Sequence, residues 1–470
     1  MTPPSQPNVL FFFTDDQRFN TIAALGNPEI HTPNLDAMVG EGVAFTHAHI
    51  MGGSAGAVCM PSRAMMMTGR SLFHLEGAGA QIPREHRLMG EVFRDAGYET
   101  FGTGKWHNGA DAYARSFTAG AHIMFGGMAD HWNVPVCDFR PDGRYPVNPL
   151  CPQPMQSNRV GSRTADHILC GCHSTDLFAD ATASFIRERP ADGPFFAYLS
   201  FMAPHDPRTM PKEFLDLYDP NALSLPENYM PGHPFDNGEL KIRDEMLEQW
   251  PRTEDAVRRH LAEYYAMISH VDAAIGRVLD ALRESGEYDN TILVFAGDNG
   301  LAVGCHGLMG KQNLYDHSVR VPLLMAGPGV PRNEMRDALC TLIDIFPTLC
   351  GLCGLDVPET VEGADLRPVM ADPHAVLRDR LFTAYMGVQR AVRDERFKLI
   401  EYVVDGYRHT QLFDLASDPA EIRNRALDPA FEETVARLRR DLRRWQTDLD
   451  DTGELGTRFW SGFEGKAGTC

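Results

Sequence analysis

Two pairs of oxygen-bearing residues each follow a short apolar run. Asp15 and Asp16 come directly after the first such run of the chain, and Asp298 and Asn299 come after a later one. If both runs are parallel strands, their carboxyl ends meet at one edge of the sheet, where open α/β sheets bind ligands. Adjacent carboxylates repel each other unless a cation holds them, and four side-chain oxygens suit Ca²⁺ or Mg²⁺ better than zinc. The two pairs therefore predict a site for one divalent cation, with helix capping by the aspartates as the open alternative.

A cysteine stands at the predicted start of a helix. Pro61 suits the first turn of that helix and Gly69 suits its end, which places Cys59 at the N-terminus. Free N–H groups and the helix dipole favour an anion there, and Arg63 can face the same anion from one turn further on. The spacing alone is equally consistent with a capped helix that buries an ordinary cysteine.

Cationic and titratable side chains recur near the other motifs. Lys105 and His107 are two residues apart after a predicted strand, so they point the same way if the chain stays extended. His205 follows another apolar run, and Lys311 lies shortly after the second oxygen-bearing pair. Each of these residues alone could be an ordinary surface or core residue. Together with Arg63 they form a positive group in a chain of net charge −20, which predicts a pocket for an anionic substrate group.

A further set of residues is a candidate for binding the rest of the substrate. Segment 110–175 is rich in Gly, Pro, His, Asp and Asn and has little periodicity, so we expect long functional loops there. An aromatic ring with amide and carboxylate neighbours suits a sugar or an aryl group. A histidine close to Lys311 could line the leaving-group pocket or could be an ordinary loop residue. These candidates are His122, Asp130, His131, Trp132, Asn133 and His306.

The elements that must position these residues alternate along the chain. Short unbroken apolar runs at 9–13, 195–201, 292–295 and 322–325 are typical of strands buried on both faces. Apolar residues at steps of three and four between positions 268 and 282 predict an amphipathic helix. This alternation predicts an α/β fold with a largely parallel sheet.

The C-terminal part has a different pattern. Segments 390–402 and 411–415 are predicted strands, and 429–449 is a predicted helix. The Gly-rich tail from 450 to 470 is expected to be a loop or to lack fixed structure. We therefore expect a catalytic domain over residues 1–375, with the loops of 110–175 around its pocket, and an α+β subdomain with a tail over residues 376–470.

Composition excludes several classes of protein. The 470 residues include 44 basic and 64 acidic ones, an imbalance that repels nucleic acid and anionic membranes. Ten cysteines without a repeating frame do not form a disulfide scaffold. The first residues lack the basic and long apolar regions of a signal peptide. We expect a cytoplasmic protein, or a periplasmic one if a leader has been removed.

The motifs together resemble the type I sulfatase family of the alkaline phosphatase superfamily. Cys59-x-Pro61-Ser62-Arg63 followed by Thr68-Gly69-Arg70 resembles the family signature, which is highly specific. Further likenesses follow in family order, and the resemblance covers about residues 7 to 445. They include Thr14-Asp15-Asp16, Gly104-Lys105-Trp106-His107, Pro204-His205, Gly297-Asp298-Asn299-Gly300, Gly310-Lys311 and Leu412-Phe413-Asp414-Leu415.

The resemblance implies a fold and a reaction. The fold is alkaline-phosphatase-like, with a large central mixed β-sheet between helices and a small C-terminal antiparallel sheet with a helix. In the reaction, a formylglycine-generating maturation enzyme oxidises Cys59 to Cα-formylglycine. The hydrated aldehyde attacks the sulfur of a sulfate monoester, the alcohol leaves, and a covalent sulfo-enzyme intermediate then releases inorganic sulfate.

The resemblance also implies a role for each site residue. Lys105 and Arg63 assist the attack on sulfur, and His107 takes the proton of the second hydroxyl. His205 and Lys311 contact the sulfate and the bridging oxygen. The implied catalytic residues are Cys59, Arg63, Lys105, His107, His205 and Lys311. The implied ligands of one divalent cation, Ca²⁺ in first place with Mg²⁺ and Mn²⁺ open, are Asp15, Asp16, Cys59, Asp298 and Asn299.

Other functions stay open at this stage. A phosphonate monoester or phosphodiester hydrolase of the same superfamily is the main alternative, although such relatives tend to carry histidine at the place of Asn299 and to lack the carboxylate of Asp16. A non-catalytic binding protein is disfavoured because none of the expected site residues is lost. We expect a small sulfated substrate, a sulfated sugar or an aryl sulfate, and neither nucleic acid nor a membrane as partner. A homo-oligomer stays open.

Overall fold

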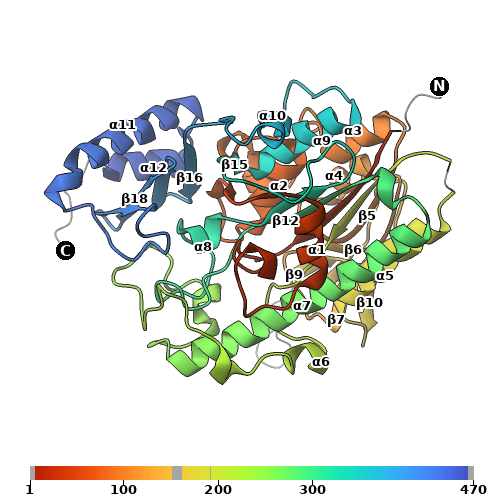
Figure 1. Cartoon of the computed structure of the whole chain (residues 1–470), viewed down its shortest axis with the longest axis horizontal. Coiled ribbons are helices and arrows are strands. Elements are labelled where there is room, and N and C mark those ends of the chain that lie inside the picture. Colours follow the sequence, from red (N-terminus) through yellow and green to blue (C-terminus); the bar gives the residue numbers. More distant parts are fainter. Residues whose placement is uncertain (1–5, 151–160, 191, 464–470) are drawn as a thin grey trace.

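The computed structural model describes residues 6–150, 161–190 and 192–463 (Figure 1). Its largest element is a ten-stranded sheet in the order β14-β2-β13-β12-β1-β11-β5-β6-β9-β8. The strands are β1 Asn8–Thr14, β2 Gly42–Phe45, β5 Glu99–Trp106, β6 Ala119–Phe125, β8 Val147–Leu150, β9 Gly161–Thr164, β11 Phe195–Ser200, β12 Thr291–Gly297, β13 Leu323–Ala326 and β14 Glu334–Arg336.

The middle of this sheet is parallel and its two sides are mixed. Strands β12, β1, β11, β5 and β6 run parallel to one another. Strand β13 is antiparallel to both β12 and β2, so the expected strand at 322–325 exists but does not extend the parallel set. Because the parallel strands share one direction, the residues after β1, β5, β11 and β12 gather at one edge of the sheet.

Alternate residues of the central strands feed two separate hydrophobic cores. In β1, Phe11 and Phe13 belong to one core, and Leu10 and Phe12 belong to the other. All four side chains are fully buried, which explains why the strand is apolar without alternation. Figure 1 shows α5 and α7 on one side of the sheet and α2, α3 and α9 on the other.

The helices that cover the sheet match the expected helical patterns in position but often differ in length. The predicted helix at 268–282 lies within α7. The helices are α1 Pro33–Glu41, α2 Cys59–Thr68, α3 Met89–Asp95, α4 Ala110–Ser116, α5 Ser174–Glu188, α6 Lys212–Leu215, α7 Glu254–Glu284, α8 Asp316–Val319, α9 Ile345–Cys353, α10 Arg367–Ala371, α11 Glu432–Asp448 and α12 Glu454–Phe463.

Segment 110–175 is not the set of long loops that its composition predicts. It contains α4, β6, β8, β9 and a small two-stranded sheet of β7 Asn133–Val136 with β10 His167–Cys170. These strands are short and lie toward one edge of the fold, where partly exposed residues break the apolar pattern. Residues 151–160 of this segment lie outside the described part of the chain.

A five-stranded sheet forms the C-terminal part, in the order β19-β18-β17-β16-β4. Four of its strands follow one another as antiparallel hairpins, and β4 comes from the segment just before α2. Segment 390–402, predicted to be strand, falls in two strands joined by a turn. The five strands are β4 Gly52–Gly53, β16 Leu381–Tyr385, β17 Gln389–Arg393, β18 Phe397–Val404 and β19 Tyr407–Asp414.

The tail is more ordered than its glycine content suggests. Residues 454–463 form helix α12, whose Phe459, Trp460 and Phe463 are buried against the small sheet together with Leu438 and Leu442 of α11. The expectation of a loop is therefore wrong up to residue 463, and the prediction for 464–470 lies outside the described residues. Within the described ranges, no helix combines the length and the apolar character needed to cross a membrane.

Candidate active site

The two oxygen-bearing pairs meet at the carboxyl edge of the sheet. Strands β1 and β12 are parallel neighbours with Thr14 opposite Gly297, so the residues that follow them are adjacent. The backbone N–H of Asp16 donates to Asp298 Oδ1 at 3.0 Å, and Asn299 Nδ2 donates to Asp16 Oδ1 at 2.7 Å. All of these side chains are buried. The structure thus brings the four expected oxygen ligands into one group.

Two atoms of this group indicate that it fits a cation. Asp15 Oδ1 and Asn299 Oδ1 are buried but have no hydrogen-bond partner among the described residues. A buried oxygen without a partner costs about 1–3 kcal/mol, and a metal ion removes that cost. Most of the potential ligand atoms at this position are oxygens, joined by the sulfur of Cys59 and a ring nitrogen of His205, and oxygen donors suit Ca²⁺ or Mg²⁺. The residues present therefore fit the divalent cation that the sequence predicts.

Cys59 lies between this group and two cationic or titratable residues. It is the first residue of α2, and Gly69 ends the helix in the left-handed conformation, as the spacing predicts. Its Sγ atom is 3.5 Å from Lys105 Nζ and 3.5 Å from His107 Nδ1. Potential ligand atoms of Cys59, Asp15 and Asp298 lie within 4.8 Å of one another. The cysteine side chain is thus next to both the cation ligands and the candidate proton-transfer groups.

Arg63 connects the strand ends beneath Cys59. Its guanidinium donates to Asp298 Oδ2 at 2.8 Å and to Asp15 Oδ2 at 3.1 Å. The Nη1 atom donates to the Lys105 carbonyl at 3.1 Å and to Ser200 Oγ at 2.6 Å. Because these donors already bind protein atoms, the position of Arg63 fixes β1, β5, β11 and β12 relative to α2.

Lys311 and His205 complete the site from two loops. Lys311 Nζ is 2.5 Å from Asp16 Oδ1, and His205 Nε2 is 3.8 Å from Asp16 Oδ2. The Nδ1 atom of His205 lies 2.8 Å from the Asp206 carbonyl, so Nδ1 carries the proton and Nε2 faces the site. His131 holds this loop because its Nε2 atom is 2.9 Å from the His205 carbonyl.

Burial and neighbouring charges separate the acidities of the three carboxyl groups. Burial raises the pKa of Asp16 to about 7 and that of Asp298 to about 6, and the charge of Asp15 adds to both. Burial also opposes ionisation of Asp15, but Lys105 and Arg63 outweigh it and hold the pKa of Asp15 well below its usual value. Asp15 is therefore the permanent negative charge of the site.

The same burial keeps Cys59, His107 and His205 neutral. It raises the pKa of the Cys59 thiol to about 11 despite the nearby Lys105, and it lowers the pKa of His205 to about 4. Burial, with Lys105 and Arg63, also holds the pKa of His107 well below its usual value. At neutral pH both imidazoles are thus able to accept a proton, whereas the unmodified thiol is a weak nucleophile.

Gly104 lets Lys105 reach this group of residues. It has a φ of +87° and lies where the pairing of β5 with β6 shifts by one residue. A Cβ atom at this position would be 1.9 Å from the Ser200 carbonyl oxygen of β11. The strand predicted before Lys105 therefore continues through Lys105 to Trp106, because residue 104 has no side chain.

Gly104→Ala is expected to destabilise the protein by about 2–3 kcal/mol and to lower activity as Lys105 shifts. The matched control is Gly97→Ala, because Gly97 has a φ of +89° but open space around its Cβ position. The control should cost about 1 kcal/mol and leave kcat unchanged. Chemical unfolding and initial rates of both variants measure these effects, and equal losses would contradict the clash with β11.

A cleft of about 220 Å³ opens over Cys59, His107, His205 and Lys311. It also contains residues that the sequence did not single out, on the loop after β6 and in the turn at 242–244. A larger cavity of about 440 Å³ lies elsewhere and does not include Cys59. The unforeseen lining residues are Gly56, Ala57, Gly127, Met128, Ile242, Arg243, Asp244 and Gln312.

The polar rim of the cleft is held by its own ion pairs. Arg243 donates to Asp206 Oδ1 at 2.8 Å and to Asp244 Oδ1 at 3.1 Å, and Asp244 Oδ2 accepts from Gln312 at 2.7 Å. Arg243 remains 45% exposed. In the sequence, two rim residues could have been noticed only because they are neighbours of motif residues: Asp206 follows His205, and Gln312 follows Lys311. No pattern marked Arg243 or Asp244.

The six residues predicted to bind substrate do not line this cleft. Asp130 Oδ1 accepts the backbone N–H of Trp132 at 2.7 Å, and the ring of Trp132 packs edge-on against His173. His131 is fully buried behind His205. His306 stacks on a tyrosine and lies 2.9 Å from the Glu421 carbonyl, toward the C-terminal part. The structure thus places these residues in supporting positions, and a direct contact with substrate stays a prediction.

The chain is similar to known proteins over most of its length. The family described as Sulfatase matches residues 7–355, and the family described as N-sulphoglucosamine sulphohydrolase, C-terminal, matches residues 304–448. An arylsulfatase of Clostridium perfringens is 29% identical over 485 residues, which cover 97% of this chain and 98% of the relative.

Solved structures share the fold at lower identity. One, in complex with its substrate D-glucosamine-2-N,6-O-disulfate, has a TM-score of 0.77 and 21% identity and covers 96% of this chain and 99% of its own. The phosphonate monoester hydrolase of Agrobacterium radiobacter has a TM-score of 0.72 and 22% identity, with coverage of 94% and 96%. The predicted fold, a large central mixed sheet between helices with a small C-terminal antiparallel sheet, is confirmed.

Proposed function

The chain belongs to the sulfatase family and hydrolyses a sulfate ester, and we propose that this ester is carried by a sugar and is cleaved at Cys59 after its oxidation to Cα-formylglycine. The observation that carries the proposal is the position of Cys59, whose side chain lies at the cleft between Lys105, His107 and the oxygen ligands. The sulfur marks where the aldehyde-bearing carbon would present its oxygens to a substrate.

The buried charges support an anionic ester. The site has three cationic side chains and three carboxyl groups, so a bound divalent cation leaves a net positive charge even when all three carboxyl groups are ionised, in a chain of net charge −20. Such a cation, held by the side-chain oxygens of Asp15, Asp16, Asp298 and Asn299, would supply Lewis-acid stabilisation of the sulfate oxygens. The balancing residues are Arg63, Lys105 and Lys311 on one side and Asp15, Asp16 and Asp298 on the other.

The acidities support a modified residue rather than a thiolate. With its pKa at about 11, the Cys59 thiol stays protonated at neutral pH, and an uncharged buried thiol is a poor nucleophile. A hydrated aldehyde supplies a hydroxyl nucleophile for sulfur and a second hydroxyl from which a base can remove a proton. His107 Nδ1, at 3.5 Å from the sulfur, is the group within reach for that proton.

The remaining residues hold or stabilise the substrate. Lys105 and Lys311 place their ammonium groups on two sides of the carboxylate pair and would face the sulfate oxygens. His205 Nε2 faces the site, and a proton delivered there would be available to the departing alcohol oxygen. Arg63 keeps the strand ends in place and acts through Asp15 and Asp298 rather than on the substrate.

The cleft itself favours a sugar as the alcohol part. Beside the apolar Met128 and Ile242, the lining offers the guanidinium of Arg243, the carboxylate of Asp244 and the amide of Gln312. Several donors and acceptors close together suit a ring with several hydroxyl groups better than an unsubstituted aryl ring. The similar solved structure that contains D-glucosamine-2-N,6-O-disulfate adds to this argument.

A panel of esters tests the proposal. We expect the calcium-loaded, matured protein to release sulfate from a sulfated monosaccharide with a higher kcat/KM than from a small aryl sulfate. A small aryl phosphonate monoester, measured in parallel, should be a much poorer substrate. A preference for the phosphonate would overturn the choice of sulfate, and a preference for the aryl sulfate would overturn the choice of a sugar.

Maturation can be checked separately from turnover. Mass spectrometry of the peptide that contains Cys59 should show an aldehyde in place of the thiol. Because Cys59 is only 2% exposed, we propose that a maturation enzyme oxidises it before folding is complete. A fully active protein with only thiol at this position would contradict the proposed chemistry.

Replacing Arg243 with alanine is expected to raise the KM for a sulfated monosaccharide about tenfold, the loss of one charged hydrogen bond. The KM for a small aryl sulfate should change less than about threefold, because that substrate leaves the rim empty. Steady-state kinetics on both substrates measure this difference. The control is Arg259→Ala, which removes another partly exposed arginine that pairs with Glu248 outside the lining of the cleft. An equal rise on both substrates would show that Arg243 acts only through Asp206 and His205.

A further inference from the structure

Three strands in segment 110–175 bring two histidines and an aspartate together. In the antiparallel bridge between β6 and the residue after β7, Ile123 and Cys137 exchange backbone hydrogen bonds of 2.9 and 2.8 Å. Their neighbours His122 and Asp138 therefore face each other across the strands. His167 begins β10 and pairs with Val136, two residues before Asp138. The register of three strands, not sequence proximity, creates this group.

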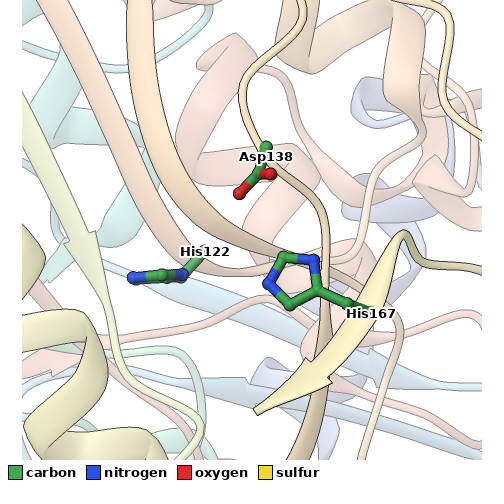
Figure 2. Close-up of side chains that lie close together, drawn as sticks. All are labelled: His122, Asp138 and His167. Carbon is green, nitrogen blue, oxygen red and sulfur yellow. The ribbon is translucent and has the colours of Figure 1, made fainter.

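The side chains converge at a partly exposed place. Potential ligand atoms of His122, Asp138 and His167 all lie within 4.8 Å of one another. Figure 2 shows the imidazole rings of His122 and His167 across from each other, with the Asp138 carboxylate above the space between them in this view. Ligand atoms of a tetrahedral zinc site lie about 3.3 Å apart when each is about 2.0–2.1 Å from the metal. Small side-chain rotations would thus bring the three atoms to coordination distance.

The three side chains do not satisfy one another. Within the described part of the chain, no hydrogen bond or ion pair joins His122, Asp138 and His167, and His122 Nδ1 is buried without any partner. A second histidine and aspartate cluster differs in this respect. There, His270 Nε2 is 3.0 Å from Asp176 Oδ1, and both ring nitrogens of His173 have backbone partners. Only the first cluster has ligand atoms that converge without being used.

The ligand set indicates the class of metal. Two neutral imidazoles and one carboxylate are typical ligands of zinc and related divalent transition metals, and Ca²⁺ and Mg²⁺ prefer oxygen ligands alone. Three protein ligands leave a coordination position for water. We propose that His122, Asp138 and His167 bind one zinc-like divalent transition metal ion, at a site separate from the predicted cation site of Asp15, Asp16, Asp298 and Asn299.

Neighbouring residues already hold the ligand-bearing loop in place. Asp166, next to His167, accepts the backbone N–H of Asp138 at 3.0 Å and the guanidinium of Arg140 at 2.7 Å. This carboxylate fixes the loop after β7 against the start of β10. The positions of two of the three ligands are therefore tied to each other before any metal binds.

The location gives this metal a structural consequence. Strand β10 leads into α5, and the backbone N–H of Ser174, the first residue of α5, donates to the His131 carbonyl at 2.8 Å. His131 in turn lies 2.9 Å from the carbonyl of His205, which lines the catalytic cleft. A metal that joins β6, β7 and β10 would stiffen the support of His205. It would stabilise the folded state without taking part in ester cleavage.

Zinc titration of the calcium-saturated full-length protein tests the proposal. We expect one equivalent of Zn²⁺ to bind beyond the cation at the catalytic site and to raise Tm. With Co²⁺ in place of zinc, we expect the visible absorption bands of a tetrahedral site. A thiolate-to-metal charge-transfer band should be absent, because the proposed ligands are nitrogen and oxygen atoms. A thiolate band would instead point to a surface cysteine such as Cys170, and would overturn the assignment.

Variants identify the ligands. Asp138→Asn and His167→Gln should each weaken zinc binding by at least about tenfold, a loss seen even when only a supporting residue of a metal site is changed. His122→Asn should do the same, and asparagine tolerates the φ of +48° at this position. The control is His374→Asn, which removes an exposed histidine outside the cluster.

The outcomes separate clearly. The site is supported if the three ligand variants lose the additional equivalent of zinc and the control variant still binds it. Asp138→Asn should also keep its sulfatase activity at saturating calcium. Wild-type zinc stoichiometry and affinity in Asp138→Asn and His167→Gln would overturn it. Asp138 is exposed, so its variant is expected to fold and keeps the test decisive. Because the readout is bound metal, the result does not depend on the identity of the ester.

Discussion

Replacing Cys59 with alanine is expected to lower kcat on any sulfate ester by at least about 10⁴-fold, the scale seen when an enzyme loses its nucleophile. Alanine removes the sulfur that lies 3.5 Å from both Lys105 Nζ and His107 Nδ1, so nothing remains to be oxidised or to attack. Initial rates of sulfate release at saturating substrate measure the loss. The variant should still bind the divalent cation, because the side-chain oxygens of Asp15 and Asn299 are unchanged.

The matched control for this variant is Cys340→Ala. Cys340 is also fully buried, but it lies in β15 (Cys340–Thr341) and packs in the hydrophobic core away from the cleft. It should lose some stability, about 1–2 kcal/mol for a small cavity, and keep its kcat within about twofold. Similar activity of the two alanine variants would show that Cys59 is not the source of the nucleophile.

Replacing Arg63 with methionine is expected to destabilise the cation-free protein by about 3–5 kcal/mol, because it leaves buried charges without their partner. Arg63 is 1% exposed and forms ion pairs of 3.1 Å with Asp15 and 2.8 Å with Asp298. Calcium should recover part of the loss, since a divalent cation also compensates these carboxylates. Urea unfolding of the wild type and the variant, with and without calcium, measures the loss in the free energy of unfolding and the part of it that calcium recovers.

The control for Arg63 is an arginine in an exposed ion pair. Arg84 pairs with Asp111 at the surface, where 76% of its side chain is accessible. Arg84→Met should change the free energy of unfolding by less than about 1 kcal/mol and should not respond to calcium. If Arg63→Met cost no more than this control, the buried pairs around Asp15 and Asp298 would not hold the strand ends together as we infer.

The sequence predicts the central strands because burial on both faces leaves a direct trace. Each of residues 9–13 of β1 enters one of two cores, so this run is apolar without interruption. The same rule fails for β5, where Gly104 and Lys105 belong to the strand but serve the site rather than a core. It fails again in segment 110–175, where short strands with partly exposed residues have no unbroken apolar run.

Long-range pairing explains the other differences. The donors of Arg63 bind Asp15, Asp298, Ser200 and the Lys105 carbonyl, all distant along the chain. Its expected part in the attack on sulfur stays a prediction. His131 supports the His205 loop, and its expected contact with the substrate stays a prediction. No local pattern encodes such partners, because they depend on how separate strands are placed side by side.

The sequence by itself determined the residue types of the site and the family, because motifs such as Cys59-x-Pro61-Ser62-Arg63 are short and local. The tertiary structure alone decided which atoms meet. It aligned the ends of β1 and β12, added Arg243 and Asp244 to the cleft, and joined His122, Asp138 and His167 through the register of three strands. The physical reason is that chemistry needs particular residue types, which a sequence contains, whereas contacts between distant segments arise only when the sheet and its cores are packed.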